Sequence, residues 1–128
     1  MEQYRNLTIA ETPLSSPFFR ERISRFLSAS GLREEPLDRY WAFLDEAGNI
    51  IAGAGISSDI IKLVAVAEEY RSEGLLAPLV SRIVADASSR GISNLKVFTK
   101  PEYRPLFESM GFRELASTPN AVLLENGR

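Results

Sequence analysis

The stretch KLVAVAEEYRSEGLLAPLVSRIVADASSRG, residues 62–91, decides the fold of this chain. It begins with an apolar run typical of a strand, crosses a polar loop, and ends in a segment whose apolar side chains recur at helical spacing. These side chains are Leu75, Leu76, Leu79, Val80, Ile83, Val84 and Ala87. The pattern predicts an amphipathic helix that Gly91 ends. An apolar run at residues 95–98 follows, and this strand-helix-strand order favours a parallel strand pair with a right-handed crossover.

The sequence before this unit predicts an antiparallel sheet. A first strand is expected at residues 6–10. A helix should begin at Ser16-Pro17, since serine caps helices and proline suits the first helical position. Gly31 should end that helix and open a polar loop over residues 31–38. Three further strands, joined by two short turn clusters, are expected at residues 40–44, 50–56 and 60–66. Two tight connections in succession indicate antiparallel neighbours.

The sequence after the unit predicts one more helix and two more strands. Thr99-Lys100-Pro101-Glu102 matches a capping box, which predicts a crossover helix that runs to about Met110 and stops at Gly111. The last strands are expected at residues 112–115 and 121–124. The predicted fold class is therefore α/β, as one domain over residues 1–128. Its mixed sheet should be antiparallel in the first half and parallel in the central pair, with helices on both faces.

Composition narrows the possible functions. The 128 residues are 45% hydrophobic and 25% charged, which is typical of one ordinary globular domain. With no cysteine and no histidine, the chain lacks the usual metal ligands and the commonest general base, so no metal site is expected. The net charge of −2 comes from interspersed charges, which indicates no nucleic-acid partner. No apolar run approaches the roughly 20 residues that span a bilayer. The first residues lack a signal-peptide pattern, so a cytoplasmic location without membrane contact is expected.

A candidate site lies between the predicted strand 60–66 and the helix after it. Arg71-Ser72-Glu73-Gly74 stands at the mouth of that helix, where free backbone N–H groups and the positive end of the helix dipole favour phosphate. A polar loop before an exposed helix start is the alternative. The segment is neither a Walker loop nor a Gly-x-Gly-x-x-Gly fingerprint. Asp59, at the start of its strand, could act as a base or simply form the turn.

Three features together resemble the GNAT acetyltransferase family over Leu7 to Leu124. They are the strand ending Val64-Ala65-Val66, the Arg-x-x-Gly helix mouth, and the later segment FESMGF at residues 107–112. The resemblance implies a GNAT-like (acyl-CoA N-acyltransferase) fold, with acetyl-CoA or coenzyme A as cofactor. It implies that the loop and helix start grip the pyrophosphate of coenzyme A, through Arg71, Ser72, Glu73, Gly74, Leu75 and Leu76. The pantetheine arm would then lie along the preceding strand, against Leu63, Val64, Ala65 and Val66.

The sequence departs from the family pattern at three positions. Leu76 stands where the family usually has Gly or Ala, and its side chain could crowd the pyrophosphate. Pro78 removes one N–H near the helix start. Phe107 stands where the family often places a tyrosine that protonates the departing thiolate. Tyr103, one helical turn earlier, could replace that tyrosine only if the helix is rotated or broken at Pro105. The resemblance therefore implies weak acetyl transfer or none.

A narrower resemblance rests on more specific strings: GIS at 55–57, KLVAV at 62–66, YRSEGL at 70–75, FTKP at 98–101 and LFESMGF at 106–112. They are similar to the N-terminal GNAT-like domain of citrate lyase ligases. In that family the whole enzyme uses ATP and acetate to acetylate the thiol prosthetic group of the citrate lyase acyl carrier subunit. The adenylate forms in a second, nucleotidyltransferase-like domain that carries His-x-Gly-His.

This narrower resemblance implies that the chain is an excised N-terminal domain. Its implied partners are the C-terminal nucleotidyltransferase-like domain and the acyl carrier subunit. The alternative is a free-standing acetyl-CoA-dependent N-acetyltransferase with an unknown acceptor.

Overall fold

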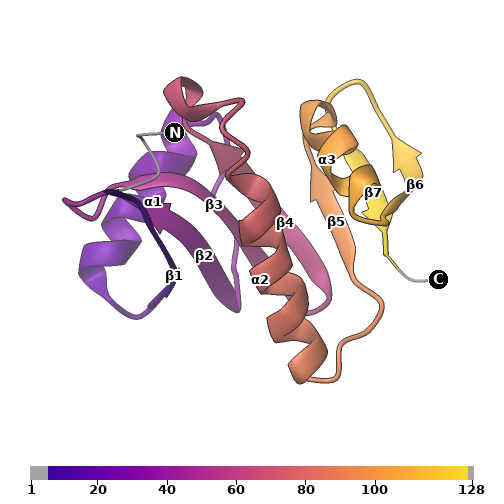
Figure 1. The fold of residues 1–128 in the computed structure, drawn as a ribbon, viewed down its shortest axis with the longest axis horizontal. Coiled ribbons are helices and arrows are strands. Elements are labelled where there is room, and N and C mark those ends of the chain that lie inside the picture. The colour runs from indigo at the N-terminus through magenta and orange to yellow at the C-terminus, as the bar shows by residue number, and fades with distance from the viewer. Residues whose placement is uncertain (1–5, 127–128) are drawn as a thin grey trace.

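A seven-stranded mixed sheet forms the centre of the molecule (Figure 1). The computed structural model describes residues 6–126. The strands are β1 (Thr8–Thr12), β2 (Arg39–Leu44), β3 (Ile50–Ser57), β4 (Ile60–Val66), β5 (Lys96–Thr99), β6 (Arg113–Ser117) and β7 (Val122–Glu125). They lie in the order β1-β2-β3-β4-β5-β7-β6. Within residues 6–126, β4 and β5 are the one parallel pair, and all other neighbours are antiparallel. The predicted mixed sheet is confirmed.

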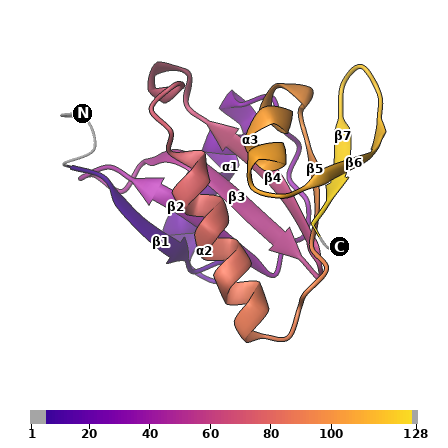
Figure 2. The same cartoon turned by 45° about the vertical axis from the view of Figure 1, so that its right-hand side comes forward.

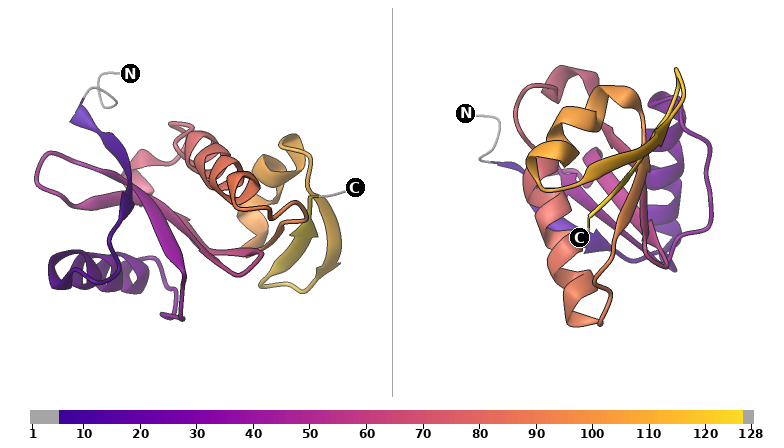
Figure 3. Two further views of the ribbon diagram at one scale, coloured as in Figure 1. Left: turned by 90° about the horizontal axis from the view of Figure 1, so that it is seen from below. Right: turned by 90° about the vertical axis from the view of Figure 1, so that its right-hand side faces the viewer.

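Helices cover both faces of this sheet, as the sequence predicts. The α-helices are α1 (Pro17–Ala29), α2 (Leu76–Ser89) and α3 (Arg104–Ser109), and two 3₁₀ turns are η2 (Glu68–Tyr70) and η3 (Pro101–Tyr103). α1 lies on one face, while α2 and α3 lie on the other (Figures 2 and 3). Phe26 of α1 packs in one apolar cluster with Tyr40. Leu79 of α2 and Phe107 of α3 belong to a second cluster across the sheet.

The helix α1 begins and ends where the sequence places it. Ser16 is its N-cap, and the hydroxyl accepts a hydrogen bond from the Phe19 N–H at 3.4 Å. The helix stops just before Gly31, whose φ of +74° suits glycine. The prediction for β1 is wrong by two residues, because pairing with β2 decides where this strand lies. Thr12 is buried within it and donates its hydroxyl to the Tyr40 carbonyl at 2.9 Å.

The predicted capping box after β5 is wrong. Thr99 is the last residue of β5, and its buried hydroxyl has no partner within residues 6–126. The segment first forms the 3₁₀ turn η3 and only then the helix α3. The physical reason is Pro105, which has no N–H to bond the carbonyl of Pro101 four residues earlier. That carbonyl instead accepts from the Arg104 N–H, which closes a 3₁₀ turn.

The last two strands also differ slightly from their predicted ranges. Phe112 bonds through its N–H to the Phe107 carbonyl at 3.0 Å, so it belongs to the end of α3 and β6 begins one residue later. β7 inserts between β5 and β6, which places the C-terminal hairpin at the edge of the sheet.

A close backbone approach in β3 gives a stability prediction. A Cβ added at Gly53 would lie 2.2 Å from the hydroxyl of fully buried Tyr40. We therefore expect Gly53→Ala to lower the free energy of unfolding by about 1–3 kcal/mol in urea denaturation, the usual cost of overpacking. In a Tyr40→Phe background the loss should be smaller but not abolished, because the hydroxyl is gone while two ring atoms of residue 40 remain 2.6 and 2.7 Å from the added Cβ. An equal loss in both backgrounds would show that the hydroxyl does not cause the clash.

Candidate functional site

The parallel strands β4 and β5 separate early. They pair only at Ile60–Lys96 and Ile61–Val97. β4 then continues to Val66, whereas β5 ends at Thr99 and turns into η3. Ligands of open α/β sheets bind outside the carboxyl ends of parallel strands, where neighbouring connections diverge. The two strand ends therefore frame the place where a ligand site is expected.

A β-bulge lies in the middle of β4. The register against β3 shifts between Gly53 and Gly55, so that Leu63 and Val64 together lie opposite one residue. Leu63 adopts a backbone φ of +57°, a left-handed conformation that is energetically costly for residues other than glycine. Leu63 consequently packs in the cluster on the α1 face and Val64 in the cluster on the α2 face. Strained residues of this kind are concentrated at functional sites.

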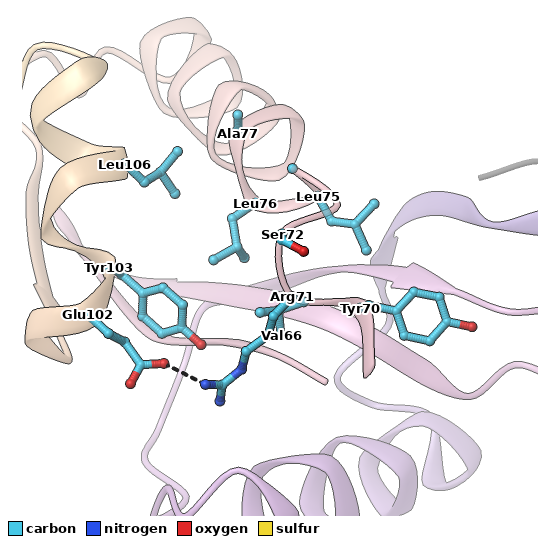
Figure 4. A pocket seen from close by; sticks show the side chains of 11 residues that line it. Val66, Tyr70, Arg71, Ser72, Leu75, Leu76, Ala77, Glu102, Tyr103 and Leu106 are labelled. Carbon is cyan, nitrogen blue, oxygen red and sulfur yellow. Dashed lines mark ion pairs between the residues drawn. The ribbon is translucent and has the colours of Figure 1, made fainter. Parts of the chain in front are cut away.

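A cavity of about 460 Å³, here called the α2 cavity, lies where β4 ends (Figure 4). Its wall comes from the loop before α2, the first turn of α2, the turn η3 and the helix α3. The lining residues are Val66, Tyr70, Arg71, Ser72, Gly74, Leu75, Leu76, Ala77, Glu102, Tyr103 and Leu106. The volume falls within the range of sites for small molecules and cofactors.

Most of the predicted binding residues lie together in this wall: Val66, Arg71, Ser72, Gly74, Leu75 and Leu76. Leu63 and Val64 instead line a smaller cavity of about 110 Å³, beside Phe98. Ala65 packs in the cluster on the α1 face, and Glu73 lines neither of these two cavities.

The sequence reasoning missed the side of the α2 cavity formed by Glu102 and Leu106. The signal that could have found it is the parallel strand pair itself. The segment after β5 must begin near the segment after β4, because the carboxyl ends of parallel strands lie at the same edge of a sheet.

The N-terminus of α2 has no side-chain cap within residues 6–126, because Leu75 occupies the N-cap position. Its first N–H groups therefore have no partner from the helix or from a capping side chain. Gly74 before it has φ +75°, which glycine adopts without strain. Pro78 is the third residue of α2, where an N–H would be free in any case, so it does not disturb the helix. By contrast, Ser16 caps α1.

Two charged side chains line the α2 cavity and contact each other. The Arg71 guanidinium lies 3.1 Å from the Glu102 carboxylate, and each side chain is about half exposed. Figure 4 shows this ion pair bridging the loop before α2 and the turn η3. Among the lining residues that the structure describes, Arg71 is the one cation and Glu102 the one anion.

Tyr103 lies in the wall of the same cavity. It is the last residue of the turn η3, directly before α3. The residue is 8% exposed, and its hydroxyl has no hydrogen-bond partner among residues 6–126. The hydroxyl lies near the Val66 backbone but outside hydrogen-bond geometry. Burial raises the pKa of the Tyr103 phenol and the Glu102 carboxylate raises it further, so the phenol stays protonated at neutral pH.

The structure also places three other residues that the sequence analysis names. Phe107 is fully buried, and its ring packs edge-to-face on Phe112 with centroids 5.4 Å apart. Leu76 is 7% exposed, and its side chain points into the α2 cavity (Figure 4). Asp59 lies at the opposite end of β4 from this cavity and pairs with Lys96 at 3.3 Å. The structure therefore does not bring Asp59 to the site.

Metal-ligand clusters and membrane-spanning helices are both absent from residues 6–126. No group of three or more His, Cys, Asp or Glu side chains is placed to hold a metal ion. No helix in the same part of the chain is long and apolar enough to cross a membrane.

The comparisons agree with this architecture. The family described as "Acetyltransferase (GNAT) domain" matches residues 5–122, so the chain belongs to the GNAT acetyltransferase domain family. Among curated proteins it is similar to [citrate [pro-3S]-lyase] ligase of Escherichia coli K12, with 35% identity over 105 residues. That match covers 81% of this chain and 30% of the ligase. The chain spans only about a third of the length of the curated relatives it matches.

Solved structures show the same fold at low sequence identity. Escherichia coli ElaA has a TM-score of 0.74 with 13% identity, and the match covers 94% of this chain and 99% of that one. A GNAT family acetyltransferase from Elizabethkingia anophelis with acetyl-CoA bound has a TM-score of 0.61 with 16% identity, over 96% and 99% of the two chains.

The Tyr103 hydroxyl, which has no hydrogen-bond partner among residues 6–126, gives a stability prediction. A buried donor without a partner costs about 1–3 kcal/mol in desolvation. We therefore expect Tyr103→Phe to raise the free energy of unfolding by about 1 kcal/mol in chemical denaturation. Tyr70→Phe, at a half-buried tyrosine of the same wall, should change it by less than about 0.5 kcal/mol. A loss of stability in Tyr103→Phe would show that the hydroxyl has a structural partner.

Proposed function

We propose that this GNAT domain binds coenzyme A or its acetyl thioester in the α2 cavity, as the ligand-binding module of a citrate lyase ligase-like protein. One observation carries the proposal. The uncapped N-terminus of α2 and the Arg71 guanidinium open onto a cavity of about 460 Å³ at the end of β4. Free backbone N–H groups at a helix N-terminus and arginine guanidinium groups are donors that proteins use to bind phosphates, and the positive end of the helix dipole adds to the attraction.

The residues present fit a ligand with an anionic head and a long, weakly polar arm. The head would lie over the backbone of residues 71–76, where Gly74 leaves room for close approach. The arm would enter between Val66 and the apolar wall of Leu75, Leu76 and Leu106. Leu76 narrows this passage, because its isobutyl group points into the space that a smaller residue would leave open.

Each part of the wall has a separate task in this proposal. Arg71 and the first N–H groups of α2 bind the phosphates and orient the ligand. Residues 62–66 of β4 are no longer paired with β5, so their backbone groups on that side are available to the amides of the arm. The leucines exclude water from the cavity. The bound group would supply the thiol that carries an acetyl unit.

The wider biochemical role rests on the curated relatives. Similarity at 35% identity to a citrate lyase ligase supports a place in a protein that acetylates a carrier thiol with ATP and acetate. The nucleotidyltransferase-like domain and the acyl carrier subunit are then the partners of this domain. A cytoplasmic location stays a prediction from the sequence.

A substitution at Gly74 tests the binding site. Gly74→Asp adds a side chain and a negative charge where the phosphate must lie, so the affinity for coenzyme A should fall at least tenfold, or about 1.4 kcal/mol, in isothermal titration calorimetry. Gly74→Asn is the matched control, since it has similar size and tolerates the same backbone conformation without the charge. It should lose clearly less. Unchanged affinity in a folded Gly74→Asp protein would place the ligand elsewhere.

The domain should transfer acetyl groups only slowly. Phe107 has no proton to give, and general acid help is worth about 10²–10⁴-fold in rate. We therefore expect turnover with small amines, followed as thiol release from acetyl-CoA, to lie well below the usual enzyme range of about 1–10³ s⁻¹. Phe107 is fully buried against Phe112 and does not line the α2 cavity, so Phe107→Tyr should not raise the rate, and neither should Phe18→Tyr at an exposed position of α1. Rapid turnover by the unaltered protein would contradict this expectation.

A further inference from the structure

The ion pair between Arg71 and Glu102 places a carboxylate inside the proposed phosphate site. The two groups are 3.1 Å apart and belong to different walls of the α2 cavity. Arg71 comes from the loop before α2, and Glu102 comes from the turn η3 after β5. Figure 4 shows the pair side by side with Tyr103. The remaining lining residues of the described structure carry no ionisable acid or base except the phenols of Tyr70 and Tyr103.

We propose that Glu102 is a specificity-determining residue: it competes with anionic ligands for Arg71 and so sets how strongly charged a ligand must be to bind. The inference rests on the proposed function, since it concerns the same cavity. An incoming phosphate must take Arg71 from Glu102, and the released carboxylate then remains close to the phosphate. Both effects weaken the binding of anions and leave neutral ligands unaffected.

The exposure of the pair explains why repulsion of the ligand by Glu102 outweighs any support that Glu102 gives to Arg71. Glu102 could in principle help by holding Arg71 in place for the ligand. However, the two side chains are 48% and 46% exposed, and ion pairs of such exposure contribute little because solvent screens them. Holding Arg71 therefore gains little. Repulsion between Glu102 and a phosphate grows once the ligand displaces water from the cavity, because the local dielectric falls.

The consequence is a preference by ligand charge. A pyrophosphate presents several oxygens to Arg71 and also reaches the N–H groups of α2, so it can replace the single carboxylate of Glu102. A lone carboxylate or a monoanion offers Arg71 no more than Glu102 already does. The α2 cavity should therefore select ligands that combine a polyphosphate with a long, weakly polar arm.

The test is a titration of the folded protein with coenzyme A and, separately, with pantetheine, which has the arm but no phosphate. Glu102→Gln should bind coenzyme A about three- to tenfold more tightly than the unaltered protein in low salt. Its affinity for pantetheine should stay the same. At about 0.5 M KCl the gain should largely disappear, because salt screens exposed charges. In an Arg71→Gln background the gain should be smaller, since the competed partner is absent.

Glu108→Gln is the matched control, since it removes an exposed carboxylate from α3 that does not line the α2 cavity. It should leave both affinities unchanged. Binding of coenzyme A to the unaltered protein with no gain, or with a loss, in Glu102→Gln overturns the inference and leaves the proposed function standing. An equal gain for pantetheine also overturns it. Absence of coenzyme A binding to both proteins overturns the inference and the proposed function together.

Discussion

The separation of β4 from β5 after the pairs Ile60–Lys96 and Ile61–Val97 is the constraint on which the site depends. If the two parallel strands stayed hydrogen-bonded to their ends, no gap for a ligand would open between them. Because β5 ends at Thr99 while β4 continues to Val66, the chain leaves β5 beside the start of α2. The loop before α2 and the turn η3 then face each other, and the α2 cavity lies between them.

The same separation gives the cavity its electrostatic character. α2 follows β4 after the turn η2 and a short loop, and within residues 6–126 no side chain caps its first N–H groups. Arg71 stands beside them, but Glu102 arrives from the opposite wall and neutralises it. A site for anions is thus present together with an internal anion. In such a site the ligand and Glu102 compete for the Arg71 guanidinium, so a substitution at residue 102 alone should change the affinity for anions.

Pro105 links the backbone of this region to its chemistry. By preventing an α-helical hydrogen bond to Pro101, it ends the turn η3 before α3 starts. Tyr103 consequently lies in the cavity wall, while Phe107, one turn later, lies in the core against Phe112. Residue 107 is a phenylalanine without a hydroxyl, and the phenol of Tyr103 is the one from this segment that lines the cavity. The Tyr103 hydroxyl has no hydrogen-bond partner among residues 6–126.

The sequence by itself determined the elements of this protein: the meander, the amphipathic α2, the ends of α1 and the parallel step to β5. These follow from periodicity and from glycine and proline positions, which act between near neighbours in the chain. It also placed Arg71 and Gly74 at the mouth of α2. Only the tertiary structure decided the bulge at Leu63, the position of β7, the burial of Phe107, and the meeting of Arg71 with Glu102 across the cavity. Arg71 and Glu102 are 31 positions apart in the chain, and local patterns carry no signal for how two separate segments approach each other.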